Sequence, residues 1–134
     1  MKIDILLPFK EKFSINSASA VSITVLNAFQ CSRFKKNINI YGQNISNPLL
    51  EENFFGLKSN WILYGGHNKS LAYNYYKKNL KHKNEKKIIE VHNRPYIFHY
   101  LRKKIKNKPI TLHFHNDPQT MKGSKTIKER EMIA

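Results

Sequence analysis

Two stretches decide the fold of this chain: Val91-His92-Asn93-Arg94-Pro95 and, further along, Leu112-His113-Phe114-His115-Asn116-Asp117-Pro118. Each begins as a short apolar run, changes to residues that exchange protons or donate hydrogen bonds, and ends at a proline. Strands of an open α/β sheet have this pattern where their carboxyl ends open into a ligand crevice. The two stretches therefore predict neighbouring strand ends with a binding site beside them.

The rest of the sequence alternates between predicted strands and predicted helices. Short apolar or alternating runs predict strands, and apolar residues at helical spacing predict helices. Such alternation is typical of an α/β fold with a doubly wound, mostly parallel sheet and right-handed crossovers. The expected strands are 3–7, 37–41, 61–64, 87–92 and 109–115; the expected helices are 18–31, 67–80, 95–105 and 125 onward; and 43–60 is expected to be irregular.

Local signals fix some helix boundaries. Ser17 or Ser19 can cap the helix that follows the first strand. Pro95 suits the first turn of a helix, and Thr126 with Glu129 has the spacing of a capping box.

Length and composition indicate one globular domain in a reducing compartment. A chain of 134 residues can form one domain with its own core but not two. Cys31 is the one cysteine, so no disulfide framework or zinc-binding spacing exists, and we expect a cytoplasmic location. Asp4 and Pro8 interrupt the apolar start, so we expect no signal peptide, and the uncharged run 13–32 is too polar to be expected to span a membrane.

The formal net charge of +15 comes from 24 Lys and Arg residues against 9 Asp and Glu residues. The cations are mostly lysine, and base-specific recognition of nucleic acid relies more on arginine, so no nucleic-acid partner is expected. The simplest interpretation is a solvated surface. Attraction to anionic lipid head groups or to phosphorylated substrates is the alternative.

Small residues follow the first strand, and polar residues follow a later one. Ser17, Ser19 and Ala20 would let backbone N–H groups approach a phosphate or a sugar, although the loop lacks the glycines of a nucleotide-binding motif. A serine-capped helix explains the same loop. His92 with Asn93 and Arg94 supplies directional donors for hydroxyl or phosphate groups, which favours a ligand-facing role.

The second strand end carries two histidines. Alternation along a strand would place His113 and His115 on one face and Phe114 on the other. If the strand continued, Asp117 would join them, and His-x-His with a carboxylate resembles a zinc or iron ligand set. No further Cys, His or Glu cluster supports a metal, so a histidine that contacts substrate is favoured, with a structural histidine as the alternative.

These strand ends, with the opening strand and its small-residue loop and the segment 121–130, resemble the N-terminal half of a glycosyltransferase family 4 enzyme. Such enzymes build lipopolysaccharide and other surface glycans. The resemblance implies a GT-B enzyme that retains anomeric configuration and requires no cofactor or metal. Residues 1–134 would be its acceptor-side Rossmann-like domain, and the second domain, which binds the nucleotide sugar, would be absent.

The resemblance also implies roles for individual residues. His115 would be the catalytic histidine near the transferred sugar. The expected substrate-binding residues are Ser17, Ser19 and Ala20 near the donor phosphates, His92, Asn93 and Arg94 on the acceptor side, and Asn116 and Asp117 beside His115.

The leading hypothesis is a glycosyltransferase fragment that is inactive alone. It would meet a nucleotide-sugar donor through the missing domain and a glycan or lipid-linked acceptor through this one, at the inner face of the membrane. One alternative is a non-catalytic basic module that binds anionic membranes or polymers. Another is a small metal-dependent hydrolase centred on His113, His115 and Asp117.

Overall fold

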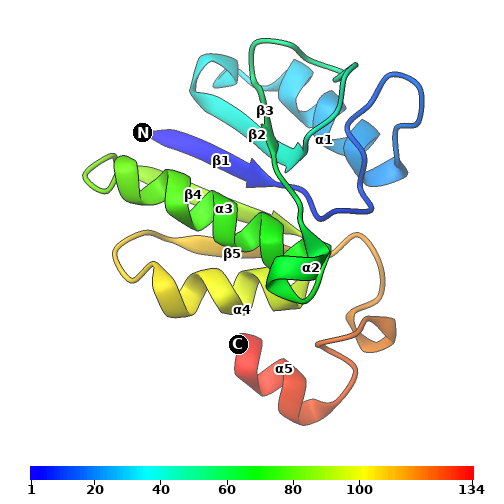
Figure 1. The fold of residues 1–134 in the computed structure, drawn as a ribbon, viewed down its shortest axis with the longest axis vertical. Coiled ribbons are helices and arrows are strands. Elements are labelled where there is room, and N and C mark those ends of the chain that lie inside the picture. The colour runs from blue at the N-terminus through cyan, green and yellow to red at the C-terminus, as the bar shows by residue number, and fades with distance from the viewer.

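The sheet is entirely parallel, as the alternation of elements predicts (Figure 1). The computed structural model describes residues 1–134 except for the side chain of Leu63. In this described part the sheet has five strands in the order β3-β2-β1-β4-β5. Their bounds are β1 Lys2–Leu6, β2 Ile38–Gln43, β3 Phe54–Leu57, β4 Lys87–His92 and β5 Ile110–His113. The protein therefore has a doubly wound, Rossmann-like α/β fold.

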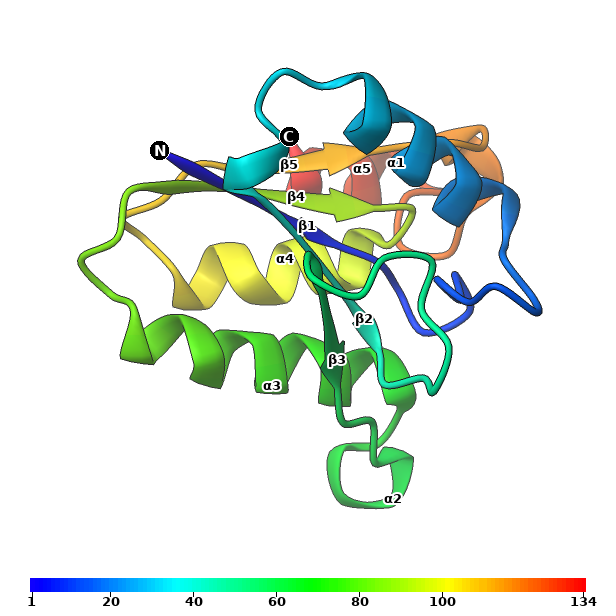
Figure 2. The same ribbon diagram turned by 90° about the horizontal axis from the view of Figure 1, so that it is seen from above.

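Helices lie on both faces of this sheet (Figures 1 and 2). Helix α1 covers one face, and α3 and α4 cover the other (Figure 2). Helix α5 packs beside α4 (Figure 1). Figure 2 shows the short helix α2 projecting from the body. The bounds are α1 Ala20–Cys31, α2 Trp61–Tyr64, α3 His67–Lys81, α4 Pro95–Lys104 and α5 Ile127–Ile133, with 3₁₀ turns at Lys35–Asn37 and Pro118–Thr120.

The alternation of side chains along each strand divides the core between the two faces. Ile5 and Leu7 pack with α1 in one cluster, whereas Leu6, Ile89 and Val91 pack with α3 and α4 in the other. On β4 and β5, the α1 side of the sheet carries polar residues in place of core residues: Glu90, His92, Thr111 and His113.

The strand order places a topological switch point between β1 and β4. The chain leaves β1 toward α1 on one face and leaves β4 toward α4 on the other. Crevices of open α/β sheets form outside the carboxyl ends of strands at such a point. The predicted polar strand end at His92 therefore lies where this fold places its ligands.

Three element predictions are wrong. The segment 43–60, expected to be irregular, contains β3, an edge strand of four residues that is too short to show periodicity. Trp61–Tyr64 is a helical turn and not a strand, because the Asn60 side chain accepts a hydrogen bond from Ile62 N and starts it. β2 runs to Gln43 and so passes the expected end of this strand at residue 41.

The predicted caps are largely correct. Ser19, and not Ser17, caps α1, and Thr126 with Glu129 forms the capping box of α5. Pro95 occupies the first turn of α4. β5 is shorter than expected and ends at His113.

Candidate functional site

The structure brings the ends of β4 and β5 into direct contact. His92 is paired in register with His113, and the Nδ1 atom of His92 lies 2.7 Å from Nε2 of His115. The rings of His113 and His115 both stack on the His92 ring, with centroids 5.0 Å apart in each case. His92 is buried, whereas His113 and His115 are exposed. The three imidazoles therefore lie on one face, with His115 open to solvent.

Asn93 fixes the position of His115. Its side-chain Oδ1 accepts a hydrogen bond of 2.9 Å from the backbone N of His115, and its own backbone N donates to the His113 carbonyl at 2.8 Å. Asn93 has a φ of 50°, in the left-handed region that asparagine tolerates better than most residues. It is only 2% exposed, and these two hydrogen bonds hold the two strand ends together.

The hydrogen bond between the two imidazoles requires one donor and one acceptor. Glu90 Oε2 lies 3.9 Å from Nε2 of His92, a distance that permits attraction but not a hydrogen bond. We assign the proton of His92 to Nε2, toward this carboxylate, which makes its Nδ1 the acceptor. His115 then donates through Nε2 and keeps the lone pair of its Nδ1.

Burial and charge shift the titration of this cluster. Burial lowers the pKa of His115, and the neighbouring His92 lowers it further, while the negative charge of Glu11 opposes both. The pKa of Glu90 is lowered, first by its interaction with His92 and also by the charge of His113, against the effect of burial. A neutral His115 beside an ionised Glu90 is therefore the favoured state near pH 7.

Of the remaining predicted site residues outside Arg94, two act as caps and the others are exposed. Ser19 Oγ accepts a hydrogen bond of 3.1 Å from Ser22 N as the cap of α1, and Ser17 and Ala20 are exposed near the start of that helix. Asn116 is exposed, and Asp117 Oδ1 accepts a hydrogen bond from Gln119 N at 2.9 Å.

The ligand set of the metal hypothesis is not assembled. β5 ends before Asp117, so this carboxylate caps the 3₁₀ turn and does not share the histidine face. Within the described residues, no group of three or more His, Cys, Asp or Glu side chains is placed to hold a metal ion.

Arg94 also lies at the carboxyl edge of the sheet, but on the face that α3 and α4 cover. It is the N-cap residue of α4 and lines a cavity of about 450 Å³ between the starts of α3 and α4 and the loop before α5. Lys69 and Lys122 also line this cavity, and neither is among the predicted site residues. The order of the elements alone could have indicated it, because helices on one face of a parallel sheet all begin at the carboxyl edge.

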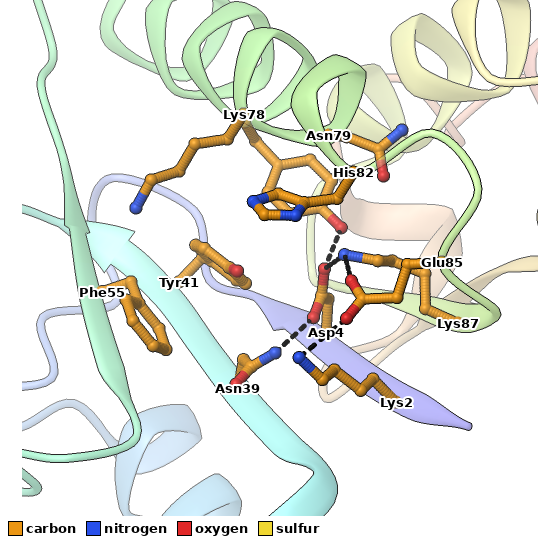
Figure 3. Close-up of a pocket in the computed structure, with 11 residues that line it drawn as sticks. Lys2, Asp4, Asn39, Tyr41, Phe55, Lys78, Asn79, His82, Glu85 and Lys87 are labelled. Carbon is orange, nitrogen blue, oxygen red and sulfur yellow. Dashed lines mark hydrogen bonds and ion pairs between the residues drawn. The ribbon is translucent and has the colours of Figure 1, made fainter.

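A second cavity, of about 190 Å³, lies near the amino ends of the strands (Figure 3). At its base Asp4, which is fully buried, accepts hydrogen bonds from Asn39 Nδ2 at 2.8 Å, Tyr75 OH at 2.7 Å and Lys87 Nζ at 2.9 Å. Lys87 Nζ also lies 3.0 Å from Glu85 Oε2. Because the hydrogen bonds of Asp4 are satisfied within the protein, we interpret this group as structural.

Comparison with protein families, curated proteins and solved structures finds no match for this chain. Among the helices of the described residues, none has the length and apolar character needed to cross a bilayer.

Proposed function

We propose that this chain is the acceptor-side part of a retaining glycosyltransferase. It would act with a second domain that binds a nucleotide sugar, transfer the sugar to a surface glycan such as lipopolysaccharide or to a lipid-linked acceptor, and be inactive alone. The observation that carries this proposal is the hydrogen bond of 2.7 Å between His92 and His115 at the carboxyl edge of the sheet. The fold and the topological switch point agree with such a role but are shared by many enzymes.

The chemistry of glycosyl transfer explains why a neutral histidine suits this position. Positive charge develops on the sugar and negative charge on the leaving phosphate. A protonated imidazole beside the sugar would oppose the first of these charges. The lowered pKa of His115 keeps its ring neutral near pH 7, and the lone pair on Nδ1 can accept a hydrogen bond from a sugar hydroxyl.

Neighbouring groups hold His115 in the required orientation. Asn93 fixes its backbone, and His92 accepts the hydrogen bond from its ring. Fixed donors and acceptors contribute to catalysis by orienting the substrate before reaction. Glu90 and His92 are therefore positioning residues, and His115 is the catalytic residue of the proposal.

Reconstitution tests the proposal. The chain would be combined with a separately produced nucleotide-sugar-binding domain of a family 4 glycosyltransferase, and consumption of a panel of nucleotide sugars would be measured with candidate acceptors. We expect transfer with retained configuration from the combination and none from either part. Failure of the combination to transfer any sugar, with both parts folded, would contradict the proposal.

A basic module that docks on anionic membranes is the second candidate, because an apolar tip projects from a lysine-rich chain. Trp61 and Ile62 of α2 are 59% and 75% exposed. Binding to anionic vesicles that weakens with salt and does not depend on nucleotide or glycan would favour this function.

A further inference from the structure

The cavity beside Arg94 is rich in cations. Lys69 of α3, Arg94 at the start of α4 and Lys122 of the loop before α5 line it, together with one carboxylate, Glu129. Its volume of about 450 Å³ lies within the range of about 300–1,000 Å³ typical of small-molecule sites. The charge of the lining groups favours an anion.

Glu129 does not neutralise these cations through a direct ion pair in the described structure. Its Oε2 accepts hydrogen bonds from Thr126 N at 2.9 Å and Thr126 Oγ1 at 3.2 Å in the capping box of α5. The ion pairs of the described side chains do not include Lys69, Arg94 or Lys122. Lys69 Nζ lies 5.6 Å from the centroid of the Tyr96 ring, and no carboxylate neutralises any of the three cations through an ion pair among the described side chains.

Two buried polar atoms of the lining also lack partners among the described atoms. These atoms are Nε of Arg94 and Nδ1 of His67. Buried polar atoms in native proteins nearly always have a hydrogen-bond partner, which is a water or a ligand where no protein group serves. Both residues line this one cavity, so its wall contains polar side chains whose hydrogen bonding is incomplete among the described atoms.

Two helices begin at this cavity without a side-chain cap. The N-cap residues are Gly66 for α3 and Arg94 for α4, and neither first turn contains an acidic residue. Each helix start carries roughly half a positive charge and N–H groups without intrahelical partners. These helix starts add to the field of the three cations.

The backbone around the cavity is shaped by glycines. Beside Gly66, at a φ of 144°, a Cβ would meet nothing within 4 Å, so a ligand has room to approach this backbone. At Gly123, at a φ of 94°, a Cβ would lie 3.2 Å from Cβ of Pro95. This close approach brings the Lys122–Gly123 loop across the start of α4.

We propose that this cavity binds the phosphate group of a phosphomonoester. Arg94 offers a planar fork of donors to phosphate oxygens, and Lys69 and Lys122 add point charges to the same cavity. The remaining volume accommodates the group that the phosphate esterifies. This site is independent of the histidine cluster, and its occupancy does not require that the chain transfer sugar.

Titration of the full chain with glycerol 3-phosphate at low ionic strength tests the proposal, with glycerol as the uncharged control. Binding would be followed by NMR shifts of the Gly66, His67 and Tyr96 amides. The fluorescence of Trp61, the one tryptophan in the sequence, provides a second signal, because its carbonyl accepts a hydrogen bond from Gly66 N. We expect saturable shifts with the phosphate ester and none with glycerol.

A matched pair of double variants separates a site from general charge attraction. Lys69→Ala/Lys122→Ala removes two cations from the cavity, whereas Lys81→Ala/Lys104→Ala removes two exposed cations from the far ends of α3 and α4. Loss of two charge-assisted contacts should weaken binding by about tenfold or more in the first variant only. Equal weakening in both, or no saturable binding by the natural chain, would overturn the proposal.

Vesicles that contain phosphatidic acid distinguish the source of the phosphate. Vesicle binding that glycerol 3-phosphate displaces, and that the cavity variant loses, identifies a lipid head group. Binding of the soluble ester without vesicle binding identifies a soluble ligand, and both results support the site. Vesicle binding that the cavity variant retains and the soluble ester does not displace would contradict it.

Discussion

His92 and His115 share one hydrogen bond, and this bond limits how many protons their rings hold. One proton serves the bond of 2.7 Å, so Nδ1 of His92 and Nε2 of His115 are not both protonated while the bond persists. Ordinary histidine titrates near pH 6.5, but burial and the neighbouring His92 lower the pKa of His115. The folded protein therefore resists protonation of this ring at a pH where the unfolded chain accepts the proton.

The sign of the resulting pH dependence follows from linkage. Just below pH 6.5 the unfolded chain binds more protons at His115 than the folded protein does, so the free energy of unfolding falls as the pH decreases. We expect the Cε1 proton of His115 to titrate below pH 6.5 by NMR. We also expect His115→Gln to reduce the loss of stability between about pH 7 and pH 5. A His115 midpoint at or above 6.5 would contradict the assignment of a neutral ring.

The buried charges of Asp4 and Lys87 illustrate what sequence alone did not reveal. Asp4 was recognised only as an interruption of the apolar first strand, and its partners Tyr75 and Lys87 are far away in the sequence. Burial alone would lower the pKa of Lys87, but Asp4 and Glu85 reverse this effect and raise it. A charged residue inside a core strand was the available signal, but it could not identify the partner.

Replacement of Lys87 tests this interpretation at the level of one side chain. The side chains of Lys87 and Asp4 are 4% and 1% exposed. Removal of one partner leaves a buried charge uncompensated, so Lys87→Met should lower the free energy of unfolding by about 3–5 kcal/mol. Lys86→Met, a change at the exposed neighbour, is the control and should have little effect. Urea denaturation of both variants measures the two effects. Similar free energies of unfolding for Lys87→Met and Lys86→Met would show that the buried pair of Asp4 and Lys87 contributes little to stability.

Elements with strong local signals were predictable, and those without them were not. α1, α3, α4 and β4 follow from apolar periodicity and capping residues, and β4 has the predicted bounds. β3 depends on tertiary contacts, because Phe54 packs toward α1 and Leu57 packs toward α3. A sequence of four residues is too short to show a pattern that predicts these contacts. The strand prediction for 61–64 is wrong because the apolar run from Trp61 resembles a strand, whereas the Asn60 side chain accepts a hydrogen bond from Ile62 N and starts a helical turn.

The cap of α1 gives a test at the level of one helix. Ser19 accepts a hydrogen bond from Ser22 N, whereas Ser17 is exposed and does not cap the helix. Ser19→Ala should destabilise the protein by about 1 kcal/mol, and Ser17→Ala should change stability little. Thermal unfolding of the two variants compares them directly. A larger loss of stability in Ser17→Ala than in Ser19→Ala would contradict the assignment of Ser19 as the cap.

The pairing of β3 with β2 gives a second test at this scale. A Cβ added at Gly56 would lie 2.9 Å from the backbone Cα of Asn44, a contact that side-chain rotation cannot relieve. Gly56→Ala should therefore cost about 1–3 kcal/mol and increase hydrogen exchange along this edge of the sheet. The same change at Gly66, where a Cβ has open space but φ is positive, separates crowding from backbone strain. Unchanged exchange in β2 and β3 would contradict the strand pairing.

At the scale of the whole molecule, the parallel order of the strands explains which site residues were predictable. Neighbouring parallel strands end at the same edge, so the meeting of His92, Asn93 and His115 followed from two strand ends in one sheet. The position of Arg94 did not follow, because the start of α4 turns it to the opposite face, toward Lys69 and Lys122. Which residues meet on that face depends on how α3, α4 and the loop before α5 pack against one another. The pattern of residues along the chain does not specify this packing.

The central claim is that His115 acts on a sugar at this edge. The decisive measurement is the initial rate of sugar transfer by the reconstituted enzyme with His115→Ala, compared with His82→Ala, which changes an exposed histidine near the opposite edge. We predict that His115→Ala lowers the rate by about a hundredfold or more and that His82→Ala leaves it unchanged. Equal rates for the two folded variants would contradict the account.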